Sequence, residues 1–144
     1  MSEDPAVAGP SRHIGNLIRR AQQTHVACWA RDVSDSISSV QYAALEVLAV
    51  HPGSSQRELG DALDLDRSTI ADLVRRMERS GLLERLRDDT DRRRNVLALS
   101  PAGEAAYARL RPRVDRLQLT LVRGLSAEET AVLRGLLARV VAVR

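Results

Sequence analysis

The chain has 144 residues, a length typical of one domain, and it is 44% hydrophobic and 28% charged. These fractions predict a soluble globular protein with a packed core, and no apolar stretch is long enough to cross a bilayer. Its single cysteine, Cys28, excludes an intrachain disulfide and does not suggest a zinc cluster.

The positive charge of the chain comes entirely from arginine. The 22 Lys+Arg outnumber the 19 Asp+Glu for a net charge of +3, and the sequence contains no lysine. Arginine forks onto phosphates and guanine edges better than lysine does. An arginine-rich genome would explain the missing lysines equally well, so the clustering of the arginines is more informative than their number.

The N-terminal stretch is acidic and rich in proline and glycine, without the apolar run of a signal peptide. We therefore expect a disordered tail over residues 1–10 and one domain over residues 11–144, in the cytoplasm. A long helix is predicted from Ser11 to about Arg31. Its apolar positions recur at helical spacing. They are Ile14, Leu17, Ile18, Ala21, His25, Cys28 and Trp29.

Two capping-box spacings predict the next two helices. Ser38 precedes Gln41 by three residues and opens a helix that ends at Pro52 and Gly53. Ser55 stands in the same relation to Glu58 and opens a short third helix.

A fourth helix and a hairpin are predicted to follow. Asp66 is a strong N-cap for the helix, and Gly81 closes it. Residues 83–87 and 95–99 can pair as two strands, with Leu97 and Leu99 on one half-buried face.

The C-terminal part is predicted to be helical. Ser100 and Pro101 open a fifth helix, which Pro112 should kink or split. Ser126 and Glu129 cap a last helix with an apolar side that nothing else in the chain covers. We therefore expect it to bury against a second copy of the chain. The apolar residues are Leu133, Leu136, Leu137, Val140 and Val141.

The fourth helix is predicted to have one buried and one polar face. The polar face has small side chains in its first turn and arginines behind them, which suits a helix that enters the DNA major groove by its N-terminus. A solvated surface face is the alternative, but the short preceding helix and the hairpin favour a helix–turn–helix. The expected DNA-binding residues here are Arg67, Ser68, Thr69, Asp72, Arg75 and Arg76.

The hairpin tip, residues 87–94, is almost entirely charged. A surface that only binds phosphate needs no aspartates, so we expect Asp91 to position the hairpin by holding an arginine, with Arg76 and Arg93 as candidates. The remaining arginines would be free to reach the DNA backbone or minor groove. A mobile, solvated loop is the alternative. The arginines expected to bind DNA are Arg92, Arg93 and Arg94.

A series of short segments runs through most of the chain after the tail: 41–45 (QYAAL), 52–59 (PGSSQREL), 65–70 (LDRSTI), 76–78 (RME), 81–83 (GLL), 91–93 (DRR) and 97–103 (LALSPAG). Together these segments resemble the MarR family of bacterial transcription regulators. The resemblance implies a mainly α fold with a small β-wing, in which residues 38–100 form a winged helix–turn–helix. It also implies a homodimer held by residues 11–33 and 101–144, with wing arginines in the minor groove. Arg94 departs from the motif, which needs two consecutive arginines, and the sequence leaves open which of the three reaches DNA.

A narrower resemblance concerns the effector. The segment 19–25 (RRAQQTH), followed by Trp29, is similar to the first helix of MarR regulators that sense aromatic acids such as protocatechuate and hydroxybenzoates. A carboxylated ring needs a cation and flat or apolar walls. We therefore expect Arg19, His25 and Trp29 to bind a small aromatic carboxylate or phenolic effector, with His13 reaching the site from the partner subunit.

These patterns predict a DNA-binding regulator, in the first instance a repressor, that binds a palindromic operator as a homodimer and is released by an aromatic acid. The alternative is a redox-sensing MarR-type regulator acting through Cys28, although the late position of Cys28 beside Trp29 favours a core role. A nucleoid-type binder without sequence preference is a further possibility. An enzyme is not expected, because the sequence has no nucleophile–base pair, no metal-spaced His/Cys cluster and no phosphate loop. No catalytic residue, metal site or cofactor is predicted.

Overall fold

The computed structural model describes residues 9–143, apart from the side chain of Ser11. Residues 1–8 of the expected tail lie outside the described residues, and Gly9–Arg12 form a short 3-10 helix. The remaining elements follow the predicted order closely. They are α1 (Ile14–Asp32), α2 (Ser39–Val50), α3 (Gln56–Leu63), α4 (Arg67–Arg79), β1 (Leu83–Arg87), β2 (Asn95–Leu99), α5 (Pro101–Leu121) and α6 (Ala127–Val141).

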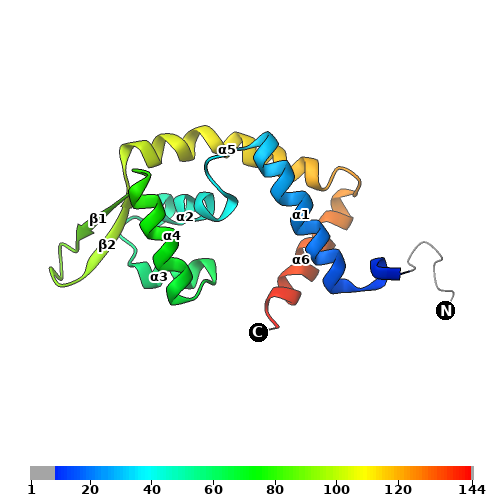
Figure 1. Cartoon of the computed structure of the whole chain (residues 1–144), viewed down its shortest axis with the longest axis horizontal. Coiled ribbons are helices and arrows are strands. Elements are labelled where there is room, and N and C mark those ends of the chain that lie inside the picture. The colour runs from blue at the N-terminus through cyan, green and yellow to red at the C-terminus, as the bar shows by residue number, and fades with distance from the viewer. Residues whose placement is uncertain (1–8, 144) are drawn as a thin grey trace.

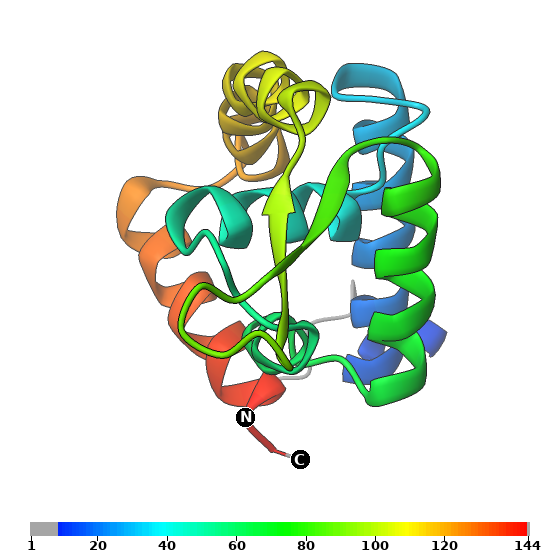
Figure 2. The ribbon, with the colours of Figure 1, turned by 90° about the vertical axis from the view of Figure 1, so that its left-hand side faces the viewer.

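Helix α5 runs along the length of the molecule and links its two ends (Figure 1). One end holds α2, α3, α4 and the β1–β2 hairpin, and the other holds α1 and α6. Helices α1 and α6 overlap in Figure 1 but lie on opposite sides in the turned view of Figure 2. The hairpin, which we call the wing (residues 83–99), therefore projects from the end opposite α6.

Side-chain caps set where the helices begin. Ser38 and Ser126 each accept a hydrogen bond from the backbone of the residue three positions on, and these two of the three predicted capping boxes are complete. In the third, Ser55 accepts the backbone N–H of Glu58, but the reciprocal bond to the Ser55 N–H is not formed. Ser100 caps α5 through the backbone N–H of Gly103 at 3.0 Å. Asp66 caps α4 through the N–H of Thr69 at 2.8 Å, as predicted.

The core joins the helix–turn–helix to the start of α5 and the end of α1. Its most buried side chains include Leu45, Leu48 and Leu59 beside Met77, Leu97 and Leu110. An aromatic row crosses it, in which Tyr42 lies 5.7 Å from Trp29 and 5.6 Å from Tyr107 between ring centroids. Burial raises the pKa of Tyr42 to about 12. The wing base and α4 both pack against this core, which fixes their positions relative to each other.

The two strands pair antiparallel, with Leu83 opposite Leu99 and Arg87 opposite Asn95. Gly81 precedes them with φ of 76°, a left-handed conformation that favours glycine and ends α4 as predicted. Leu97 is buried and Leu99 is half-buried, but Val96 on the opposite face is buried as well. The wing base is therefore covered on both faces, which the expected alternation did not include.

One expectation for the long helices needs correction. Pro112 was expected to kink α5 or to split it, and the split is wrong because the helix is continuous through this residue. The missing proline N–H removes one backbone hydrogen bond, and the helical turns on both sides of Pro112 remain formed. Most of the first apolar stripe of α1 is exposed, including Ile14, Leu17 and Ile18. Within the described part of the chain, no helix is long and apolar enough to span a membrane.

Candidate nucleic-acid interface

Helices α3 and α4 form the helix–turn–helix. The turn contains Asp64 in the left-handed conformation, with φ of 55°, and Leu65 donates its N–H to the carbonyl of Gly60 at 2.9 Å. A Cβ at Gly60 would lie 3.3 Å from Cγ2 of Ile70 and 3.4 Å from the carbonyl oxygen of Leu65. Gly60 therefore lets α3 and α4 approach closely, a role that the sequence patterns did not reveal.

The polar face of α4 is exposed along its whole length. All six residues predicted there for DNA binding are exposed. Ser68 donates its hydroxyl to Asp66 at 3.0 Å, and Arg75 lies 3.5 Å from Asp72 in an ion pair. The hydrogen bond from the Thr69 N–H lowers the pKa of Asp66, so the cap is an anion at neutral pH.

A hollow of about 500 Å³ lies between α3 and the start of α4. It opens beside the polar face of α4. Its lining residues are Gln56, Arg57, Gly60, Asp61, Leu65, Arg67 and Ile70.

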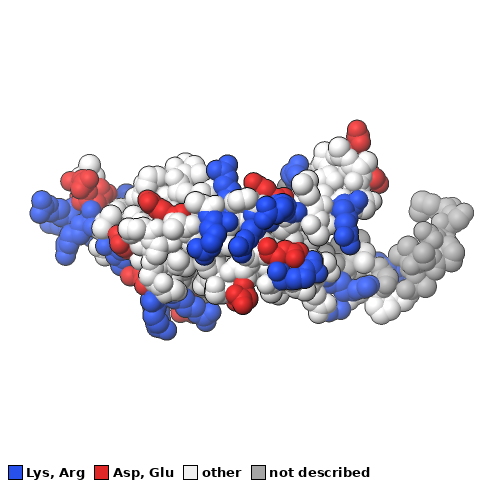
Figure 3. All heavy atoms as spheres, turned by 90° about the horizontal axis from the view of Figure 1, so that it is seen from above, with Lys and Arg blue, Asp and Glu red and all other residues white. Residues whose placement is uncertain are grey.

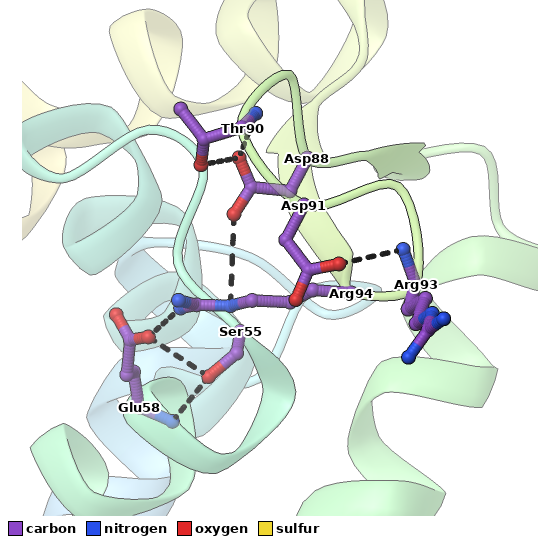
Figure 4. A network of polar contacts seen from close by, with 7 residues as sticks. All are labelled: Ser55, Glu58, Asp88, Thr90, Asp91, Arg93 and Arg94. Carbon is purple, nitrogen blue, oxygen red and sulfur yellow. Dashed lines mark hydrogen bonds and ion pairs between the residues drawn. The ribbon is translucent and has the colours of Figure 1, made fainter.

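The wing tip, residues 88–94, is ordered by its own aspartates (Figure 4). Asp88 accepts hydrogen bonds from the N–H and hydroxyl of Thr90, at 3.1 and 3.0 Å. Asp91 accepts the backbone N–H of Arg93 at 3.0 Å, and its carbonyl accepts the N–H of Arg94. The expectation that Asp91 pairs with the guanidinium of Arg76 or Arg93 is therefore wrong, because a short Asx-type turn satisfies this carboxylate first.

The three consecutive arginines of the wing have different surroundings. The guanidinium of Arg94 pairs with Glu58 of α3 and lies 4.0 Å from Asp88. Within the described residues, the side chains of Arg92 and Arg93 bind no partner, and both are exposed. Arginines and acidic side chains gather together at the wing end of the molecule (Figure 3).

Two residues that no sequence pattern marked for this role, Arg85 and Glu58, connect the wing to the helices. Arg85 of β1 donates to Glu78 of α4 at 2.9 Å and to Gln56 of α3 at 3.1 Å. Glu58 was expected only to complete a capping box. The sequence alone gives only a weak indication that Glu58 pairs with an arginine of the wing. The two residues are 36 positions apart, so their pairing depends on the fold.

The four residues expected at the effector site are only partly brought together. His25 and Trp29 lie edge to face, with ring centroids 5.9 Å apart, but Trp29 is buried and donates Nε1–H to the carbonyl of Ile37. Arg19 donates to Asn16 at 2.7 Å, one turn earlier, and His13 is the exposed N-cap of α1. Among the described residues, no contact joins Arg19 or His13 to the aromatic pair.

Cys28 is half-buried and packs against the core. Its sulfur accepts a hydrogen bond from Arg31 at 3.7 Å. Arg31 also forms an ion pair with Asp32 at 2.7 Å, and this hydrogen bond lowers the pKa of Asp32. No group of three His, Cys, Asp or Glu side chains in the part of the chain described here could hold a metal ion.

The arrangement of these elements is shared with known transcription regulators. The family model described as "MarR family" matches residues 35–94, which contain the helix–turn–helix and the wing tip. The transcriptional regulator HosA of Escherichia coli is 34% identical over 112 residues, which cover 78% of this chain and 82% of HosA. The chain belongs to the MarR family.

Solved structures of MarR-family regulators extend the likeness to the whole fold. The PcaV transcriptional regulator from Streptomyces coelicolor, solved with its natural ligand, is 40% identical, covers 99% of this chain and 98% of its own, and gives a TM-score of 0.86. BpsR of Bordetella bronchiseptica, whose DNA binding is regulated by 6-hydroxynicotinic acid, is 26% identical, covers 95% of this chain and 99% of its own, and also gives 0.86. This MarR-family protein is a transcription regulator and not an enzyme.

Proposed function

We propose that this MarR-family regulator acts in the cytoplasm as a homodimeric repressor, with α4 in the major groove and the wing in the minor groove of a palindromic operator. The observation that carries the proposal is the pair of exposed surfaces at one end of the molecule. The polar face of α4 offers hydroxyls and guanidinium groups for base edges, and the exposed side chains of Arg92 and Arg93 have no partner among residues 9–143. Such groups fit direct readout and minor-groove contact respectively.

The uncovered helices support the dimer. No side chain of α6 is buried, although its apolar stripe includes Leu136 and Leu137, which are 49% and 47% exposed. Ile14 and Leu17 of α1 are likewise exposed. Exposed apolar stripes of this kind mark an interface, and a two-fold partner would cover them while placing two wings on one side of a duplex.

The first test is DNA binding by the purified protein. A duplex that it selects from a randomised pool should be nearly palindromic, with half-site centres about one helical turn, ~34 Å, apart. Replacing Arg92, Arg93 and Arg94 together by alanine should weaken binding to every sequence and flatten its salt dependence, because phosphate neutralisation is lost. Replacing Thr69 or Arg75 should instead change which bases are preferred, by about 1–3 kcal/mol for each good contact.

Two outcomes would contradict this assignment. A triple variant that binds the selected duplex normally at physiological salt would remove the wing from the interface. Selection of no consensus at all would favour a nucleoid-type binder without sequence preference.

For the effector we propose a small aromatic carboxylate or phenol that binds where α1 meets the winged part of the molecule. BpsR responds to an aromatic acid and PcaV was solved with its natural ligand, which supports this class. Arg19 would bind the carboxylate and the His25–Trp29 pair would form a wall. Because Arg19 and His13 lie away from that pair in one subunit, the partner subunit would complete the site. Binding must favour the DNA-incompetent state, since only differential affinity shifts an equilibrium.

A further inference from the structure

Glu58 departs from the geometry of the other two capping glutamine and glutamate residues in this chain. Gln41 and Glu129 each accept the backbone N–H of their cap residue, at 3.1 and 2.9 Å. Glu58 occupies the same helix position in α3, but its Oε1 accepts the hydroxyl of Ser55 at 3.1 Å and the guanidinium of Arg94. Its carboxylate thus points out of the helix start and towards the wing (Figure 4).

Arg94 connects Glu58 to the rest of the wing tip. Its Nη2 contacts Glu58, and its Nε lies 4.0 Å from Oδ2 of Asp88. The other carboxylate oxygen of Asp88 holds both the N–H and the hydroxyl of Thr90. A continuous polar chain therefore runs from the first turn of α3 to the outermost turn of the wing.

The base of the wing has separate attachments. Leu97 forms a bridge with Ser54 through two backbone hydrogen bonds of 2.8 and 3.1 Å, the second with the N–H of Gly53. Arg85 is tied to both α3 and α4. Among the described residues 88–94, Arg94 is the one whose side chain forms a hydrogen bond or ion pair with a helix, so this pair ties the tip directly to the helix–turn–helix.

We propose that Glu58 and Arg94 form a latch that fixes the wing tip against α3, which makes Arg94 a positioning residue and leaves Arg92 and Arg93 as the arginines presented to DNA. This proposal rests on the DNA-binding function proposed above. It also gives a role to the third consecutive arginine, which the family motif does not require.

The physical effect of the latch is to order the tip before DNA arrives. Its side chains remain 43% and 54% exposed, and an exposed ion pair adds little to the free energy of unfolding. Restraining a binding loop in advance, however, removes an ordering cost from the association step. Because Glu58 neutralises Arg94, the pair also presents no net charge to the phosphates.

The decisive variant is Glu58→Gln, tested against a duplex that the wild-type protein has selected from a randomised pool. If Arg94 were simply a DNA contact, removal of a neighbouring negative charge would strengthen binding. The latch instead predicts that Glu58→Gln weakens binding, by about three- to tenfold, because the tip is released. Asp61→Asn is the matched control, since it removes a carboxylate from the same helix without touching the wing, and it should not weaken binding.

A double-mutant cycle separates positioning from DNA contact. Glu58→Gln combined with Arg94→Gln should bind no more weakly than the worse single variant, and exchange of the two charges by Glu58→Arg with Arg94→Glu should recover most of the affinity. The double Gln variant has the same net charge as the wild type and should keep its salt slope. Arg92→Gln should lower the slope by about 0.9, the value for one phosphate contact.

A second readout needs no DNA. Trypsin should cleave the free Glu58→Gln variant after Arg92 and Arg93 faster than the wild type, whereas Asp61→Asn should be cleaved at the wild-type rate. Unchanged cleavage, additive effects in the cycle, or tighter binding by Glu58→Gln would each overturn the latch. A wild-type protein that binds no duplex would overturn the DNA-binding proposal and with it the positioning role of Arg94. The trypsin cleavage rates would still show whether the Glu58–Arg94 pair restrains the wing tip.

Discussion

At the scale of single residues, α1 contributes some side chains to the core and exposes others that could bind a ligand. Trp29 is 6% exposed and its Nε1–H is already bound by Ile37, so only part of its ring edge can face an effector. His25 is half-buried against it, and Arg19 is exposed with Asn16 as its partner. A buried carboxylate without a cation is strongly disfavoured, so one arginine should dominate effector affinity.

We therefore expect Arg19→Ala to weaken binding of protocatechuate and simple hydroxybenzoates at least about tenfold while leaving DNA binding intact, because a charge-assisted pair is lost. Trp29 is the only tryptophan of the chain, so its fluorescence reports ligand binding next to the site. Release of labelled operator should be measured in the same titration.

Arg20→Ala, one position along the helix, is the control for a change of net charge. An unchanged response in Arg19→Ala would remove Arg19 from the site, and a wild type that responds to no aromatic acid would remove the ligand class. The redox alternative makes a different prediction, since peroxide would then release DNA from the wild type but not from Cys28→Ser. The packing of Cys28 against the core favours a structural role for this thiol.

At the scale of secondary-structure elements, the N-terminus of α4 has a titrating cap. Asp66 accepts the N–H of Thr69, and this hydrogen bond lowers the pKa of Asp66 below the ordinary value of 3.8. The unfolded chain therefore takes up a proton at higher pH than the folded one. Stability from the cap is fully present above the ordinary pKa and is lost as the pH falls through the lower, folded-state pKa.

We expect Asp66→Asn to fold at neutral pH, because asparagine caps helices about as well as aspartate, and to be less acid-sensitive than the wild type. The melting temperature of the wild type should fall further between about pH 6 and about pH 3 than that of Asp66→Asn. Asp61→Asn, which removes a carboxylate that caps no helix, should follow the wild-type curve. Parallel curves for the wild type and Asp66→Asn would show that the cap carries no pH-dependent stability.

At the scale of the whole molecule, α6 packs against little of its own chain. None of its side chains is buried, and in Figure 2 it stands apart from α1. Its start is nevertheless well defined by the Ser126 and Glu129 capping box. A helix that is locally well specified but has an uncovered apolar stripe requires a partner, and the proposed dimer supplies one.

We expect the wild-type protein in solution to have a mass about twice 15.9 kDa. Leu136→Glu with Leu137→Glu should shift it towards the monomer and weaken operator binding, because the two half-sites are then no longer bound together. Val50→Glu, at a position 63% exposed at the end of α2, is the control for an added charge on exposed apolar surface. Light scattering that finds a stable monomer for the wild type at micromolar concentration would contradict the proposal.

Local order in this protein could be predicted from short-range patterns. The strands at Leu83–Arg87 and Asn95–Leu99 and the caps at Ser38, Asp66 and Ser126 all fall where spacing placed them. Each depends on interactions within a few residues, so the necessary groups are neighbours in the sequence. The exposure of the polar face of α4 follows in the same way from helical periodicity.

The incorrect predictions concern mainly polar side chains that could bind more than one partner. Asp91 was expected to take a guanidinium and instead accepts the nearby N–H of Arg93, which its turn presents to it. Glu58 was expected only to complete a capping box with Ser55, and its carboxylate also binds Arg94, 36 residues away. A split at Pro112, one of the two effects expected there, does not occur, since the helix continues through it.

What the sequence by itself determined was therefore the elements, their capping residues and the faces they expose, since these follow from contacts within one or two turns or from strand alternation. Only the tertiary structure decided which arginine of the wing is held by α3, that Arg85 joins the wing to both helices, and that Trp29 belongs to the core. Ion pairs and core positions of this kind depend on distances between segments remote in the chain, and those distances exist only after the helices have packed.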